Sequence, residues 1–146
     1  EALGTDQIAA FGTDQIVALT TKQLAVLSTD QIGALTTDQV AALGVKQIAA
    51  LSSAQVEALD SDQVEALTAT QIAALSAAAI GVMASDEIAT FSADEIAAIN
   101  VKALSGLSTD HIGALDSDQV QAFTTQQVQA FNNAQLEAVL AAYAAF

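Results

Sequence analysis

The chain has 146 residues, 53% of them hydrophobic, which is long and apolar enough to bury a core and excludes an intrinsically disordered segment. Seventeen acids against three lysines give a net charge of −14, which excludes binding to nucleic acid or to an anionic membrane surface. No apolar run reaches the roughly 18 residues of a membrane span, and the lack of cysteine excludes disulfides, thiolate metal sites and thiol catalysis.

An eight-residue repeat fills the chain. Residues 3–146 divide into eighteen consecutive octads without insertion or deletion, numbered here from octad 1 at 3–10 to octad 18 at 139–146. Glu1 and Ala2 fit the last two positions of an octad, so we expect the array to begin before this sequence does. Position 1 is apolar in every octad, and position 6 is Ile, Val or Leu in all but the last.

The polar columns of the octad predict a helix start. Position 2 is Ser, Thr, Asp, Asn or Gly in sixteen octads, and these are the preferred N-cap residues. Position 5 is Gln in twelve octads, so segments such as Ser28–Gln31 have the pattern of a capping box, which is complete in ten octads. Positions 1 and 6 then form a hydrophobic staple, as Leu35 and Val40 do, and Asp at position 4 complements the helix dipole.

These columns predict an all-α fold, an α-solenoid of very short helices, one per octad, running from position 3 to about position 8. One continuous helix is excluded because eight residues turn its apolar face by roughly 80° per repeat. A β-solenoid is excluded because the octad lacks period-two alternation. We expect residues 1–146 to form one array with positions 1, 6 and usually 8 turned inward. With two helices per layer, the array would span on the order of 80 Å.

Three segments depart from the pattern. In residues 75–90, Ala79 replaces the glutamine and Ala84 the cap, so we expect the helix that begins after Ser76 to continue until Ser85 caps the next. Residues 99–106 carry Ala103 at position 5 and end in a glycine, which predicts a local irregularity. Residues 139–146 contain no capping residue, so one longer helix over about 133–146 is expected to cap the solenoid.

The sequence offers little for catalysis. His111 is the single histidine, but it stands in the glutamine column without a second His, a Cys or a triad-like Ser, so we interpret it as structural. No catalytic, cofactor-binding or metal-binding residue is predicted, and no cofactor.

A calcium site is the main alternative for the acidic residues. The nearest approaches to a calcium loop are Asp60-Ser61-Asp62 and Asp116-Ser117-Asp118, but each supplies only two carboxylates, and one of these is better placed as an N-cap. A solvated acidic face is therefore favoured. The three lysines stand in the Asp column and are too sparse for a binding patch: Lys22, Lys46 and Lys102.

The glutamine column suggests a structural role beyond capping. Side chains repeated at a fixed spacing can hydrogen-bond from one coil to the next as well as to their own cap. We therefore predict a polar ladder formed by Gln31, Gln39, Gln47, Gln55, Gln63 and Gln71.

The octads at 35–42 and 67–74 resemble the L-S/T-x-x-Q-I/V-x-A arrays of large, repetitive bacterial surface or secreted proteins of adhesin-like type. The resemblance implies an extended spacer, extracellular or on the bacterial cell surface. The sequence thus predicts a non-enzymatic structural module that acts as a spacer or stalk.

Two alternatives stay open. One is a solenoid that binds a protein or divalent cations through its acidic face, with specificity at the variable positions Glu57, Glu65, Gln121, Gln129 and Glu137. The other is end-to-end self-association into filaments, because uncapped repeat ends expose apolar faces.

Overall fold

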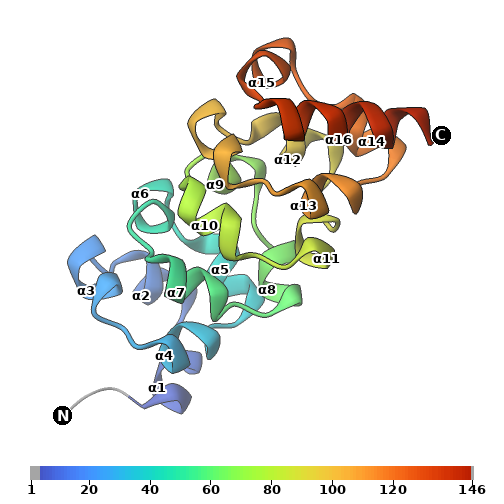
Figure 1. Ribbon diagram of the computed structural model, residues 1–146. Helices are drawn as coiled ribbons and strands as arrows, with labels where there is room; N and C mark the ends of the chain where they lie inside the picture. Colours follow the sequence, from blue (N-terminus) through green and yellow to red (C-terminus); the bar gives the residue numbers. More distant parts are fainter. Residues whose placement is uncertain (1–3, 146) are drawn as a thin grey trace.

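A computed structural model describes residues 4–145, which contain helices and no strand. The helices follow one another at one per octad and stack into a column, an all-α solenoid (Figure 1). Octads 1–9 supply α1 (Thr5–Ala9), α2 (Thr13–Val17), α3 (Thr21–Ala25), α4 (Thr29–Gly33), α5 (Thr37–Ala42), α6 (Val45–Ile48), α7 (Ser53–Glu57), α8 (Ser61–Glu65) and α9 (Ala69–Ile72).

The second half of the array continues the same path and ends in one longer helix. Its elements are α10 (Ala77–Val82), α11 (Ser85–Ile88), α12 (Ala93–Ala98), the 3-10 helix η1 (Val101–Gly106), α13 (Thr109–Gly113), α14 (Ser117–Gln121), α15 (Thr125–Ala130) and α16 (Asn133–Ala144). The predicted fold class is confirmed.

Apart from α11, the helices begin where the capping columns predict. The ten predicted capping boxes all form: the N-cap side chain accepts a hydrogen bond from the N3 amide, and the N3 side chain accepts one from the N-cap amide. Gly4, Gly12 and Gly44 have no side chain to offer, yet their amides still donate to the glutamine at N3 at 2.8 Å. Helices of four to six residues are far below the length that is stable alone, so packing between coils must hold them.

The superhelix has between three and four octads in each turn. Each of the first six helices packs against the third helix after it, α1 against α4 through α6 against α9. Side-chain hydrogen bonds connect positions 28 and 31 residues apart. The two-helix layer assumed from the sequence is therefore wrong. At about 8–10 Å between packed helices, the roughly five turns of this array span about 40–50 Å instead of 80 Å.

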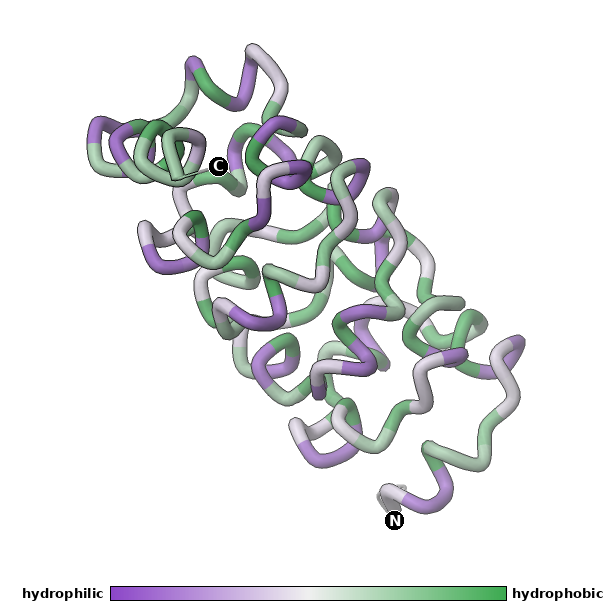
Figure 2. Tube along the Cα trace, turned by 90° about the vertical axis from the view of Figure 1, so that its right-hand side faces the viewer, coloured by the Kyte–Doolittle hydropathy of each residue, from purple (hydrophilic) through white to green (hydrophobic). Residues whose placement is uncertain are grey.

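The core runs along the axis of the column. Positions 1 and 6 fill it, and the side chain of position 6 is fully buried even in the first coil, as at Ile8, Ile16 and Leu24. Figure 2 shows hydrophobic segments along the inside and hydrophilic ones at the outer bends. Position 8 turns inward in most octads but is only half-buried, as at Ala34. Ala74 and Ala122 pack against the core, whereas Ala10 and Ala18 in the first coil are exposed. Position 5, which holds the glutamines, is a further inward column and is more deeply buried than position 8.

The irregular octads differ from expectation in one place. No helix runs from Ser76 to Ser85, because α10 ends at Val82 and Met83 is extended. Ala84, with no capping side chain, is the N-cap of α11, and its amide donates to Glu87 Oε2 at 2.8 Å. With Ala84 as the N-cap, Met83 and Ile88 are both buried in the core. A cap at Ser85 would shift the helix by one residue and turn these two side chains away from the core. In residues 99–106 the predicted irregularity is the 3-10 helix η1.

The C-terminal helix lies across the end of the column. α16 packs against α13 and α14 (Figure 1). Gln135 and Val139 are its buried side chains, whereas Leu140 and Tyr143 are exposed. The expected helix over 133–146 is thus present over Asn133–Ala144, and Phe146 lies outside the described residues.

Candidate functional site

One glutamine side chain joins the ends of two helices. Gln55 Oε1 accepts a hydrogen bond from the amide of Ser52, the N-cap of its own helix, at 3.0 Å. Its Nε2 donates to the carbonyls of Leu24 and Leu27 in the preceding coil, at 3.0 and 2.9 Å. Both ends of the carboxamide are therefore used, one within the octad and one between coils.

The same bridge recurs along the array, and we call the bridging position-5 side chains the glutamine ladder. Each reaches one carbonyl 28 residues earlier and another 30 or 31 residues earlier. The bridging glutamines are Gln39, Gln47, Gln55, Gln63, Gln71, Gln119, Gln127 and Gln135. The predicted ladder is confirmed for Gln39 through Gln71. The last three were not named by the sequence hypothesis, although they stand in the same column.

Gln31 is the remaining member of the predicted ladder. Its Oε1 accepts from the amide of Ser28 at 2.8 Å. The residue 28 positions before it is Leu3, which lies outside the described residues.

The ladder solves a problem that short helices create. The last carbonyls of a helix have no partner within it, and in helices of five residues such carbonyls are a large share of the backbone. The glutamine of a later coil supplies the missing donors. The bridging glutamines are only 1–6% exposed, and among residues 4–145 no buried side-chain nitrogen or oxygen lacks a hydrogen bond. Because burying an unpaired polar group costs about 1–3 kcal/mol, the bridges must hold their geometry.

His111 takes the place of a glutamine in this ladder. Its Nδ1 accepts from the amide of Ser108 at 3.1 Å, and its Nε2 lies 3.0 Å from the carbonyl oxygen of Met83, again 28 residues earlier. These two bonds require the tautomer with hydrogen on Nε2, since a carbonyl can only accept. Both ring nitrogens are thus engaged in the fold, in agreement with the structural interpretation of this residue.

The acidic residues lie where the octad predicts. Asp60 and Asp116 act as N-caps, accepting from the amides of Gln63 and Gln119 at 2.8 and 2.9 Å. The Asp side chains of position 4 lie in first turns and are exposed. Among the described residues, no three His, Asp or Glu side chains gather where they could hold a metal ion. The three lysines are exposed and scattered over octads 3, 6 and 13.

Two glycines allow helices to approach more closely than a side chain would permit, which the sequence reasoning did not foresee. A Cβ on Gly106 would lie 2.0 Å from the carbonyl oxygen of Ala77, and one on Gly33 would lie 2.9 Å from that of Ala58. A Cβ on Gly113 would have no other atom within 4 Å. Between α10 and η1, close contact between backbones thus takes the place of a ladder bridge.

Residues 4–145 also contain no helix with the length and apolarity needed to cross a bilayer.

The fold and the ladder define the class of this protein: it is an α-solenoid repeat protein whose coils are cross-linked by side-chain amides. The pattern of the ALTTAQ repeat matches residues 1–21, 16–45, 41–69 and 92–125, more than two thirds of the chain, and the chain belongs to the ALTTAQ repeat family. A search of curated proteins found no match.

Proposed function

We propose that this array is a non-enzymatic structural module that acts as a stiff spacer. The observation that carries the proposal is the complete use of the octad in folding. Position 2 caps, positions 1 and 6 fill the core, and the position-5 carboxamide bridges coils with both of its ends, as Gln55 does. The Asp side chains of position 4 are exposed, and the charge of −14 keeps the molecules apart in solution.

The geometry of the superhelix favours a stiff column over one that is long for its number of residues. The surface of the chain is 7466 Å², close to the roughly 7,000 Å² of a compact protein of this mass. One turn of about 28 residues adds about 8–10 Å of length, far less per residue than the 1.5 Å of an α-helix. Such a column is stout, and hydrogen bonds tie each coil to the next. A long stalk of this kind requires many octads.

The setting we propose is the bacterial cell surface or the extracellular space. It rests on the resemblance of the octads at 35–42 and 67–74 to repetitive surface and secreted proteins. Acidic side chains around the outside and the lack of cysteine are compatible with that setting.

Small-angle scattering on a length series tests the spacer proposal. Duplicating residues 19–74 adds seven octads, or two turns, and should lengthen the particle by about 16–20 Å at constant cross-section. The radius of gyration of the parent chain should exceed the roughly 15 Å of a compact chain of this length. A variant whose cross-section grows while its length stays fixed would mean that the octads close on themselves, and the spacer proposal would be abandoned.

A second candidate function is end-to-end association with another copy of this chain. Leu140 and Tyr143 on α16 are 60% and 61% exposed, and Glu137 is the last charged side chain. These two exposed apolar side chains give α16 a surface that a second copy could cover. At the other end, Gln7, Gln15 and Gln23 are exposed and lie in the first coil.

Sedimentation equilibrium of the parent chain and of Leu140→Glu tests this association. We expect the mass of the parent chain to rise with concentration and that of the variant to stay monomeric. A parent chain that stays monomeric at millimolar concentration would remove this candidate and leave the spacer proposal intact.

A further inference from the structure

The glutamine ladder is interrupted over four consecutive octads. Position 5 of octads 10–13 holds Ala79, Glu87, Glu95 and Ala103 in place of glutamine. The bridges span 28 to 31 residues, so four octads amount to one turn of the superhelix. The position-5 side chains of the complete coil formed by octads 10–13 therefore cannot bridge to the coil before it.

The chemistry of these side chains explains the interruption. Alanine has no polar group. Glu87 and Glu95 each use Oε2 to accept from their own N-cap amides, at 2.8 and 2.7 Å, as a glutamine would use Oε1. A carboxylate has no hydrogen to donate, so neither can bond the carbonyl 28 residues earlier, which belongs to Leu59 or Leu67. Both glutamates are half-buried, whereas the bridging glutamines are buried.

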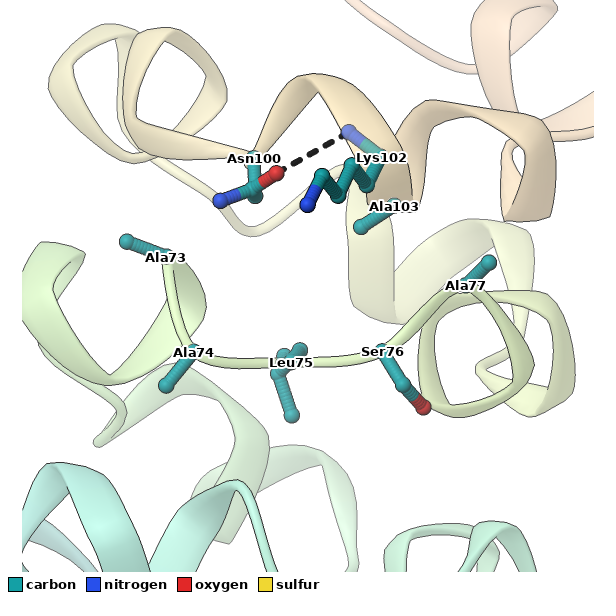
Figure 3. Close-up of a pocket in the computed structure, with 8 residues that line it drawn as sticks. All are labelled: Ala73, Ala74, Leu75, Ser76, Ala77, Asn100, Lys102 and Ala103. Carbon is teal, nitrogen blue, oxygen red and sulfur yellow. Dashed lines mark hydrogen bonds between the residues drawn. The ribbon is translucent and has the colours of Figure 1, made fainter.

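A cavity marks the same boundary. It has a volume of about 290 Å³ and lies between the segment from Ala73 to Ala77 and the start of η1, with Asn100, Lys102 and Ala103 on the far side (Figure 3). Leu75, on its floor, stands 28 residues before Ala103 and is the residue that a glutamine at 103 would reach. The cavity thus lies between the two residues that a ladder bridge would join.

Apolar packing alone replaces the bridges across this boundary. α10 packs against α7, α11 against α8, and α12 against α9, and Ile80 and Ile88 are fully buried there. On the other side of the same coil the ladder resumes, with His111 and then Gln119 reaching back to Met83 and Phe91.

We propose that the array consists of two nine-octad blocks, residues 4–74 and 75–145, joined at a compliant seam that separates first when the superhelix is stretched or bent. In a solenoid, stability is a sum of nearest-neighbour interfaces, so the interface that lacks its hydrogen bonds divides the cooperative unit. Within each block the ladder links the coils, except that Ala103 leaves out the bridge to Leu75, where Gly106 packs closely against Ala77. Under load, the stiff column therefore bends or separates at one defined interface, between residues 4–74 and 75–145.

Single-molecule stretching of the full chain, held at its two ends, tests the proposal. We expect two unfolding steps, each releasing about 250 Å of chain, which is the contour length of roughly 71 residues. Gln55→Leu should weaken only one step and Gln127→Leu only the other, because each variant removes a bridge within one block. Unfolding in one step, or octad by octad, would overturn the proposal.

A paired variant tests whether the missing donors cause the seam. The double variant Glu87→Gln, Glu95→Gln supplies amide donors for the bridges and keeps the oxygens that accept from the N-cap amides. It should lower the rate of the first unfolding step at constant force about tenfold or more. Glu57→Gln with Glu65→Gln is the matched control, because it removes the same charge, also eight residues apart, from exposed positions outside the ladder. An equal effect of the two pairs, or none from the first, would contradict the assignment.

Discussion

Gly106 lies against the backbone of Ala77 so closely that a Cβ on the glycine would be 2.0 Å from the alanine carbonyl oxygen. The contact joins η1 to α10, where alanine stands in place of glutamine at position 5 of both octads. Small residues and a tightened helix therefore bring these two elements together without a bridging side chain.

Substituting Gly106 by alanine should destabilise the fold, because the added methyl group must displace backbone. We expect a loss of about 1–3 kcal/mol, typical of overpacking. Gly33→Ala, with 2.9 Å to the nearest oxygen, should cost less, and Gly113→Ala should stabilise by up to about 1 kcal/mol because nothing lies within 4 Å. Thermal unfolding of the three variants measures the order, and a Gly106→Ala protein as stable as Gly113→Ala would refute the close contact.

Replacing Gln55 by leucine should lower the free energy of unfolding by about 2–3 kcal/mol more than replacing Gln23. Both glutamines accept from their own N-cap amide, but only Gln55 also donates to carbonyls of an earlier coil. The difference between the two variants thus isolates the bridge, whose loss leaves buried carbonyls without a donor. Urea titration followed by circular dichroism measures it, and equal losses would reduce the ladder to capping alone.

His111→Gln should fold with nearly unchanged stability, whereas His111→Leu should lose about 2 kcal/mol or more. The carboxamide can accept from Ser108 and donate to the Met83 carbonyl in the way the imidazole does. Nitrogen NMR of the parent protein should show the hydrogen on Nε2. Finding it on Nδ1 would contradict the bond to the Ser108 amide.

Ala84→Ser should stabilise α11 by about 0.5–1 kcal/mol. Ala84 has the extended conformation of an N-cap but no side chain to accept from the first turn. Ala78→Ser places the same hydroxyl at an exposed position inside α10, where it should be neutral or slightly unfavourable. A melting temperature that moves equally in both variants would show that the cap at this position has no effect.

The octad alone predicts the helices well because capping and stapling are local. Ser28 and Gln31, three residues apart, contain the whole capping signal, and the structure has that helix start. The error at Ser85 shows the limit of local rules. There, keeping Met83 and Ile88 in the core outweighs the preference for a serine cap.

The number of octads per turn could not be predicted in the same way. It depends on which carbonyls Gln55 meets 28 and 31 residues away, and no pattern within eight residues encodes that distance. Position 5 of the octads did contain one sign of the long-range structure. The run from Ala79 to Ala103 without glutamine is as long as one turn, and this becomes meaningful only once the turn is known.

The ladder also determines how such an array can change in length during evolution. Octads 5–9 each offer the same carboxamide and each reach the same two kinds of carbonyl, so gain or loss of a whole octad leaves every glutamine facing an equivalent partner. Gain or loss of a single residue would instead misalign every bridge that spans it. Recombination that adds or removes whole octads can therefore change the size of the column without compensating mutations.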